Sequence, residues 1–573
     1  MSKPIAQERS FIYEVVRIYW DSVARFPGKR KRRLRSLFKS IGGLPELSLR
    51  RCASADVLAG ELSKLSVFDA AYRIGEIYSQ RLPKEYRSRY GIYFTPPALA
   101  YRLMDNAESA GIDWATVRIV DPACGGGAFL FPIAHRIKNV LREAGKAPGE
   151  IIDHIAAHLF GNEIDPFSAW LSQVFVDITL LDEAYRSSKR LPILVTVSDS
   201  LAERPAQGSY DLVIGNPPYS KIKLSEEMRE QYARSLYGHA NLYGLFTDQG
   251  LSLLKEGGVL AYVTPTSFLS GQYFKNLRRL LTEEASPVNI DFIATRDGVF
   301  EGVLQETLLA TFVKNTEQQC PATSHAMHVS SRENTEIVAN GVFRIDARSS
   351  DPWFIPRSAE HAGLLTAAAA MPQRLAGYGY KVSTGPLVWN RHKDQILQRP
   401  GKCRFPLIWS ECVQSDGTFI FKSEKKNHAP WFKHLGAKDD WLLVTTPCLL
   451  LQRTTAKEQR RRLIAAQLPA KLIDDHCAVV VENHLNMVLP RSSRAPEVSF
   501  DALHRIISSK VVDDLFRSLN GSVAVSAYEL EAIPLPSLEQ AHAIQSAVES
   551  GVPDSEIEEM IKDAYREPVR VAA

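Results

Sequence analysis

The feature that most constrains the fold of this chain is a regular alternation of short apolar runs with amphipathic segments between residues 90 and 315. The apolar runs cover 117–120, 158–161, 193–197, 210–214, 259–263, 289–294 and 308–313. Helical patterns occupy 128–143, 166–182, 241–255 and 271–284. Strands that alternate with helices build a mostly parallel sheet covered on both faces. The pattern therefore predicts an α/β fold for this region.

The chain of 573 residues divides into four regions by pattern. Residues 1–85 show helical spacing, and residues 86–320 hold the α/β pattern. The polar residues 321–350 predict a connector, and residues 351–573 mix strand-like and helical pieces, which indicates an α+β domain. No apolar run approaches the roughly 18 to 20 residues of a membrane span, so we expect a soluble, cytoplasmic protein with no membrane partner. Seven scattered cysteines without a CxxC pair argue against disulfides and a metal site.

Positive charge is concentrated in two stretches, although the whole chain carries a formal net charge of only +4. Residues 25–39 contain eight basic residues and no acidic one. Residues 381–462 hold 16 basic and 7 acidic residues, and four of the eight tryptophans lie there as well. Basic residues interleaved with aromatics favour a nucleic-acid partner. A solvated charged face beside buried tryptophans explains the same counts, and both interpretations stay open at this point.

A glycine loop follows the first apolar run of the α/β region. The segment Asp121-Pro-Ala-Cys-Gly-Gly-Gly127 runs from a predicted strand into a predicted helix. Glycines allow a ligand to approach the backbone closely, and a helix N-terminus attracts an anion. A plain tight turn is the alternative explanation. Leu130 stands where the dinucleotide pattern needs Gly or Ala, and no phosphate-binding G-x-x-x-x-G-K-[ST] motif occurs, so nicotinamide enzymes and P-loop hydrolases are disfavoured.

Acidic residues follow the next two predicted strands. Glu163 ends the second strand, and a carboxylate at that edge of a parallel sheet can accept both hydroxyls of a ribose. Asp165 precedes Pro166, so we assign Asp165 to the cap of the following helix. Asp199 follows the third strand and is a candidate acceptor for an adenine amine.

The fourth strand ends in Asn216-Pro217-Pro218-Tyr219, a tetrapeptide whose two prolines make a stiff turn. The amine of adenine is a poor nucleophile because its lone pair is delocalised into the ring. If the side-chain carbonyl of Asn216 and the backbone carbonyl of Pro217 accept its hydrogens, the lone pair becomes available. Tyr219 would stack on the base. The alternative is a rigid structural turn in which Asn216 is a local cap.

These segments, in this order, resemble the N6-adenine DNA methyltransferases of the γ motif order, which occur in bacterial restriction-modification systems. The resemblance covers about 90–315 strongly, from Gly91-Ile-Tyr-Phe-Thr-Pro-Pro97 through the glycine loop to the tetrapeptide at 216–219. It implies a Rossmann-like S-adenosylmethionine-dependent methyltransferase domain with a mostly parallel, seven-stranded sheet. The chain departs from the family at Gly126, where Ser is common, and we expect little effect because both residues are small.

The resemblance also implies roles for individual residues. The implied cofactor-binding residues are Thr95, Asp121, Ala123, Gly125, Gly127, Glu163, Ile164 and Asp199. Asn216, Pro217 and Tyr219 would be catalytic, and Phe300 would pack on the flipped adenine opposite Tyr219. Transfer would need no metal and no covalent intermediate.

The region from 351 onward would be the target recognition domain for double-stranded DNA. The candidates for DNA contact are Arg391, Lys393, Arg404, Arg460 and Arg461, each of which could also touch only solvent. The role of the basic residues 29–35 stays open in the same way. We find no nuclease motif, so we expect any cognate restriction endonuclease to be a separate chain.

Two rival functions remain at this stage. The same tetrapeptide serves methyltransferases that act on release-factor glutamine or on bases of ribosomal RNA, although those proteins are typically much shorter. The second rival is a DNA-binding protein that has lost catalysis, and such a protein would have lost residues of the glycine loop or of the tetrapeptide. Both segments are intact here.

Overall fold

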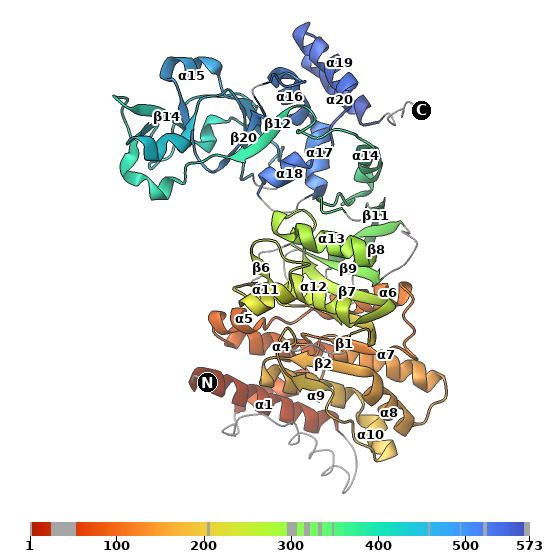
Figure 1. Cartoon of the computed structure of the whole chain (residues 1–573). Coiled ribbons are helices and arrows are strands. Elements are labelled where there is room, and N and C mark those ends of the chain that lie inside the picture. Colours follow the sequence, from red (N-terminus) through yellow and green to blue (C-terminus); the bar gives the residue numbers. More distant parts are fainter. Residues whose placement is uncertain are drawn as a thin grey trace. The chain divides into compact units, whose positions relative to one another are not determined.

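The structure is a computed structural model of the chain (Figure 1). It describes residues 3–24, 53–202, 207–294, 306–314, 321–329, 335–345, 349–455, 459–492, 494–519 and 524–566. The chain forms two compact units. The first comprises Met1–Phe268 and Tyr273–Ser350, and the second comprises Leu269–Gln272 and Asp351–Ala573. No helix of the described residues is both long and apolar enough to cross a membrane.

The first unit is built on a nine-stranded sheet with the order β11-β10-β8-β9-β7-β4-β1-β2-β3. Its strands are β1 (Ile119–Asp121), β2 (Leu159–Glu163), β3 (Val195–Val197), β4 (Tyr210–Gly215), β7 (Leu254–Pro265), β8 (Ala285–Ile293), β9 (Thr307–Lys314), β10 (Ala322–Val329) and β11 (Thr335–Phe343). Neighbours from β3 to β7 pair in parallel, and β9 runs antiparallel to both β7 and β8. The α/β class is as predicted, but the expected count of seven strands is two short.

The two additional strands come from the segment expected to be a connector. β10 pairs in parallel with β8, and β11 pairs antiparallel with β10 at the edge of the sheet. His325 of β10 fastens this edge, since its Nδ1 lies 2.9 Å from Oδ1 of the buried Asp291. The connector expected at 321–350 is therefore wrong for these strands. Neither strand is fully buried, so neither forms the continuous apolar run that the other strands show.

Helices cover both faces of this sheet. Every residue of β7 from Gly258 to Pro265 is consequently buried, whichever face its side chain points to. α6 (Pro97–Ser109), α7 (Leu130–Glu143) and α9 (Pro166–Thr179) pack against one another in turn, and α12 (Leu242–Leu253) packs on α13 (Lys275–Glu284). The remaining helices of this region are α8 (Pro148–His158), α10 (Leu181–Ser187) and α11 (Glu226–Gln231). α11 connects the two strands of a small antiparallel pair along the chain, β5 (Lys221–Ile222) and β6 (Ala240–Asn241).

The N-terminal helices belong to the same hydrophobic core as the sheet. They are α1 (Lys3–Val23), α3 (Ala53–Leu62), α4 (Val67–Arg81) and α5 (Lys84–Tyr90). Ile12 and Val16 of α1 are fully buried in one cluster with Trp170 of α9, and the ring of Tyr13 stacks on that tryptophan at 5.1 Å. The helical region expected at 1–85 is therefore part of the first unit, because its apolar face has α9 to pack against. The basic residues 25–39 lie outside the described residues.

The second unit contains two small sheets. The first has the order β12-β20-β17-β18 and the second β13-β15-β14-β19-β16. Their strands are β12 (Tyr380–Thr384), β13 (Ile396–Leu397), β14 (Arg404–Ile408), β15 (Trp431–Lys433), β16 (Leu443–Val444), β17 (Leu449–Gln452), β18 (Ala465–Gln467), β19 (Val479–Val481) and β20 (Leu485–Pro490). The helices are α14 (Ala359–Ala369), α15 (Ala470–His476), α16 (Phe500–Ile507), α17 (Lys510–Leu519), α18 (Ala527–Glu531), α19 (Leu538–Glu549) and α20 (Asp554–Ala564).

Candidate functional site

The glycine loop connects the carboxyl end of β1 to α7 and needs glycine for two different reasons. Gly125 and Gly127 have φ values of +54° and +86°, a region that L side chains rarely adopt. A Cβ added to Gly127 would also lie 2.9 Å from the Cα of Ser172 on α9. The loop is therefore held close to α9.

The middle glycine of this loop, Gly126, packs against an aromatic ring. A Cβ at Gly126 would overlap the ring of Phe94, and so would a Cβ at Gly75 of α4 from the other direction. Phe94 fills the space that a side chain at Gly126 would need, and the expectation that Gly in place of the family's common Ser has little effect stays a prediction. Phe94 lies in the Gly91–Pro97 segment, so this segment and the glycine loop are packed together.

Asp121 ends β1 with a buried and incompletely satisfied carboxylate. Its Oδ1 accepts a hydrogen bond from the backbone N–H of Ala123 at 3.0 Å. Its Oδ2 is buried and has no hydrogen-bond partner among the described residues. Burial raises the pKa of Asp121 to about 8. A buried carboxylate oxygen without a partner is suited to receive a cation or a hydrogen-bond donor from a ligand.

Glu163 ends β2 and ties the glycine loop to the start of α9. Its Oε2 accepts from the backbone N–H of Gly125 at 2.9 Å, and its Oε1 accepts from the N–H of Asp165 at 2.8 Å. Burial raises the pKa of Glu163 to about 7, against the opposing effect of these hydrogen bonds. Asp165 is the N-cap of α9 and accepts from Ser168 N at 2.9 Å, which confirms the predicted cap. Ile164 between them is 46% exposed.

Asp165 is also half of a buried ion pair with Arg9 of α1, whose side chain is 4% exposed. Arg9 donates to the hydroxyl of Tyr78 on α4 at 3.1 Å and to that of Tyr86 on α5 at 2.8 Å. Tyr86 in turn donates to Asp165 at 2.9 Å. Helices α1, α4, α5 and α9 therefore meet at the guanidinium of Arg9, and its ion-pair partner Asp165 is two residues from Glu163 along the chain. Arg9 was not predicted from the sequence, because a lone arginine in a helix carries no signal of its distant partner.

Asn216 and Tyr219 lie beyond the carboxyl end of β4 and are hydrogen-bonded to each other. Asn216 Nδ2 donates to Thr95 Oγ1 at 3.0 Å, and the Tyr219 hydroxyl donates to Asn216 Oδ1 at 2.6 Å. Burial raises the pKa of Tyr219 well above its ordinary value, so the phenol stays a neutral donor. The predicted acceptor oxygen of Asn216 is thus already oriented by Tyr219. Pro218 closes against Gly91, where an added Cβ would lie 2.6 Å from the Pro218 Cβ.

A cavity of about 200 Å³ joins these segments. The predicted residues that line it are Thr95, Asp121, Ala123, Gly125, Glu163, Ile164, Asp199 and Asn216. Asp199 is exposed there, and its carboxylate accepts from Leu201 N at 3.1 Å. Gly127, Pro217 and Tyr219 are not among the lining residues, and Phe300 lies outside the described residues. One cavity therefore touches the carboxyl ends of β1, β2 and β4 and the turn after β3.

Other lining residues were missed by the sequence analysis. They are Arg89, Tyr90, Tyr93, Phe94, Ile222, Met228, Leu242 and Phe246, with loop residues between them. Tyr93 and Phe246 fall inside segments that the resemblance singled out, so their aromatic character was an available signal. Ile222 and Met228 come from the β5–α11 segment, which no motif marks. Among the described residues, no group of three or more His, Cys, Asp or Glu is placed to hold a metal ion.

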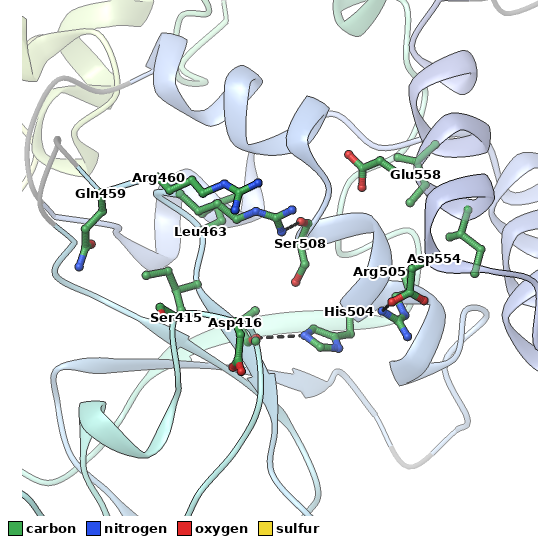
Figure 2. Close-up of a pocket in the computed structure, with 16 residues that line it drawn as sticks. Ser415, Asp416, Gln459, Arg460, Leu463, His504, Arg505, Ser508, Asp554 and Glu558 are labelled. Carbon is green, nitrogen blue, oxygen red and sulfur yellow. Dashed lines mark hydrogen bonds and ion pairs between the residues drawn. The ribbon is translucent and has the colours of Figure 1, made fainter.

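The five arginines and lysines predicted to contact DNA fall in two places of the second unit. Arg391, Lys393 and Arg404 lie on or beside the β13-β15-β14 part of the second sheet. Arg460 and Arg461 line a separate cavity of about 410 Å³ between β18, α16 and α20, shown in Figure 2. Trp409 is 1% exposed whereas Trp441 is 63% exposed, so the tryptophans of this stretch divide between core and surface.

The fold and the site correspond to a class of known proteins. Residues 145–300 match the family described as Eco57I restriction-modification methylase. The resemblance to restriction-modification methyltransferases that the motifs indicated is thereby confirmed.

Particular relatives extend the likeness beyond that segment. The chain is 24% identical over 463 residues to type II methyltransferase M.BsuBI of Bacillus subtilis, covering 79% of this chain and 88% of the relative. It is 26% identical over 364 residues to M.PstI of Providencia stuartii, covering 62% and 71%. Among solved structures, the type IIL restriction-modification enzyme MmeI in complex with DNA matches with a TM-score of 0.55 and 13% identity, covering 96% of this chain and 86% of that one. This last likeness shows a shared fold.

Proposed function

We propose that this protein is a site-specific DNA methyltransferase that transfers a methyl group from S-adenosylmethionine to the N6 amine of adenine, within a restriction-modification system. The observation that carries the proposal is the placement of the Asn216 amide at the wall of the same cavity as Asp121, Glu163 and the glycine loop. The match of residues 145–300 and the type II methyltransferase relatives support it.

The residues present fit such a cofactor. The unpartnered Oδ2 of Asp121 suits the ammonium of its methionine part, and Glu163, whose oxygens each accept one bond, keeps lone pairs for ribose hydroxyls. Asp199 at the rim of the cavity suits an adenine amine. When bound, the cofactor supplies an electrophilic methyl group on a sulfonium.

The chain's own groups would prepare the acceptor. Asn216 Oδ1 has two lone pairs and Tyr219 occupies one, so the other is free for a hydrogen of the adenine amine. Thr95 fixes the Asn216 side chain through its Nδ2, which orients that lone pair before substrate arrives. The backbone carbonyl of Pro217 would accept the second hydrogen, and the amine lone pair is then available for attack.

The acceptor base must leave the duplex to reach this wall. Flipping costs a few kcal/mol, which stacking and hydrogen bonds in the pocket offset. Tyr219 is the side chain of the tetrapeptide that would contact the flipped base, and Phe300 is its proposed partner. The hydroxyl of Tyr219 already donates to Asn216, so the ring keeps one orientation before the base arrives.

The test is transfer of labelled methyl from S-adenosylmethionine to duplex DNA, followed by separation of the nucleosides. We expect N6-methyladenine as the product. Asn216→Ala should lower the rate about 100- to 1,000-fold, as expected for loss of one positioned polar group, with nearly unchanged cofactor affinity. Asn139→Ala on α7, whose side chain contacts His135 among the described residues, is the matched control and should retain the rate. Label on 5-methylcytosine, or on RNA or protein but not on DNA, would contradict the proposal.

A further inference from the structure

The β13-β15-β14 part of the second sheet carries cations from four separate segments, all exposed except Arg404, which is half-buried and donates to the backbone carbonyl of Arg399 at 2.7 Å. We call this the basic face, and its members are Arg391, Lys393, Arg399, Lys402, Arg404, Lys433 and Lys438. Arg404 and Lys433 are cross-strand neighbours in the β14–β15 pair. The segment before β13 is joined to them by Gln395, whose Nε2 donates to the carbonyl of Lys433 at 2.9 Å and to Asp439 at 2.8 Å.

None of these seven cations lies within ion-pair distance of a carboxylate in the described part of the chain. The same segments hold three acids, Asp394, Asp439 and Asp440, of which Asp394 is exposed. Asp439 is 3% exposed and accepts from the N–H of Leu435 at 2.9 Å, and Asp440 lies 2.8 Å from the imidazole of His434. Elsewhere in this unit cations have acidic partners, as in Lys471 with Asp475. The seven cations outnumber the three acids of these segments, so the basic face keeps a local positive field.

An exposed tryptophan lies in the same loop system. Trp441 is 63% exposed on the short 3-10 helix η7 (Ala437–Leu442), and Leu435 at the start of that loop is 48% exposed. The other tryptophans of the stretch are packed, since Trp409 stacks on His428 at 3.9 Å and Trp389 contacts Trp409 edge to face. An exposed indole beside unpaired cations is the combination that grips nucleic acid, because phosphates bind the cations and bases cover the ring.

The cavity of Figure 2 lacks this character, although it contains Arg460 and Arg461. Arg505 in its wall is paired with Asp554 at 2.8 Å. Asp416 and Glu558 complete the lining, so its three arginines face three carboxylates. This cavity has no net charge with which to attract a polyanion.

From this contrast we infer that the basic face is the surface of the second unit that binds DNA, and that Trp441 packs against a base step that is unstacked in the bound duplex. The inference rests on the proposed function and deepens it, because it selects one of the two groups of predicted DNA contacts. Arg391, Lys393 and Arg404 bind phosphate backbone, and Arg460 and Arg461 do not contribute. The occupant is duplex DNA, as charge complementarity requires.

The first test measures duplex binding by the full chain over a range of salt concentrations. The triple variant Arg391→Gln, Lys393→Gln, Lys433→Gln should lower the slope of log affinity against log salt by about 3, since each phosphate contact contributes about 0.9. The double variant Arg460→Gln, Arg461→Gln is the control and should keep the wild-type slope. An unchanged slope in the triple variant, or an equal loss in the double variant, overturns the inference.

The second test concerns Trp441. Trp441→Ala should weaken duplex binding about 5- to 150-fold, as expected for one stacked base, and Trp441→Phe should restore part of it. Ile420, which is 50% exposed in the same unit, gives the control variant Ile420→Ala with wild-type affinity. All variants should keep the wild-type melting temperature. Wild-type affinity in Trp441→Ala overturns the inference, whereas a wild-type protein that neither binds nor methylates duplex DNA overturns the proposed function instead.

Discussion

The charged residues of the two units are used in opposite ways. Around the cavity of the first unit the carboxylates of Asp121, Glu163 and Asp165 are buried, and most of their oxygens are held by backbone N–H groups or by Arg9. On the basic face of the second unit all the cations but the half-buried Arg404 are exposed, and none has an ion-pair partner in the part of the chain that the structure describes. Buried charges act strongly in a low dielectric and keep one geometry, whereas exposed charges act weakly and in sum. Catalysis needs charges that are buried and fixed in one geometry. Binding of a repeating polyanion needs many exposed charges that act together.

The largest expected effect is at the buried ion pair. Arg9→Leu leaves Asp165 buried without its charge partner, so we expect the free energy of unfolding to fall by about 3 to 5 kcal/mol. Urea titration followed by circular dichroism measures this change. Arg81→Gln on α4 breaks the exposed ion pair with Glu8, which lies on α1 as Arg9 does. The side chains of Arg81 and Glu8 are 46% and 27% exposed, so the loss in unfolding free energy should be less than about 1 kcal/mol. Equal losses in the two variants would remove the contrast between buried and exposed charges.

A smaller effect is expected at Asp121, where one substitution should lower cofactor affinity and raise the stability of the cofactor-free protein. Asp121→Asn removes the acceptor for a cofactor cation, and we expect cofactor affinity to fall about 10- to 100-fold in calorimetric titration. The pKa of Asp121 is about 8 in the folded protein, so its proton competes with the cofactor below that pH. Wild-type affinity should therefore weaken as pH falls below 8, and the variant should lose this dependence.

The same raised pKa has a consequence for folding. The unfolded carboxyl releases its proton near pH 4, whereas the folded one holds it to about pH 8, so stability attributable to Asp121 declines as pH rises between these values. Asp121→Asn should consequently raise the melting temperature of the cofactor-free protein at pH 8. A lower melting temperature would indicate that the buried carboxylate is structural rather than reserved for a ligand.

The smallest effect is expected for one cation of the basic face. Lys393→Gln removes a single exposed ammonium, which lies 5.5 Å from the ring of Trp389. The slope of log affinity against log salt should fall by about 1, with less than about 1 kcal/mol change in unfolding free energy. Fluorescence anisotropy with labelled duplex measures the slope. A loss of affinity as large as that of the triple variant would show that Lys393 acts alone rather than as one of a sum.

Much of the first unit could be predicted because its signals are local. Strand endings, the glycine loop and the Asp165 cap each depend on a few consecutive residues, and parallel strands bring their carboxyl ends to one edge. Contacts between distant segments could not be predicted in this way. The packing of Phe94 between Gly75 and Gly126 is one, and the bond from Tyr219 to Asn216 is another, since Tyr219 was expected only to stack. β10 and β11 were missed because both are only partly buried and neither is a continuous apolar run.

The sequence by itself determined the α/β class of the first unit, the order of its ligand-facing turns and the amide placed for an amine, because these depend on residues that are neighbours along the chain. Only the tertiary structure decided that Arg9 supports the cap beside Glu163, and that the predicted DNA contacts divide between an unpaired basic face and a charge-balanced cavity. The physical reason is that a charge is neutralised by whatever lies next to it in space. That partner can stand more than a hundred residues away along the chain.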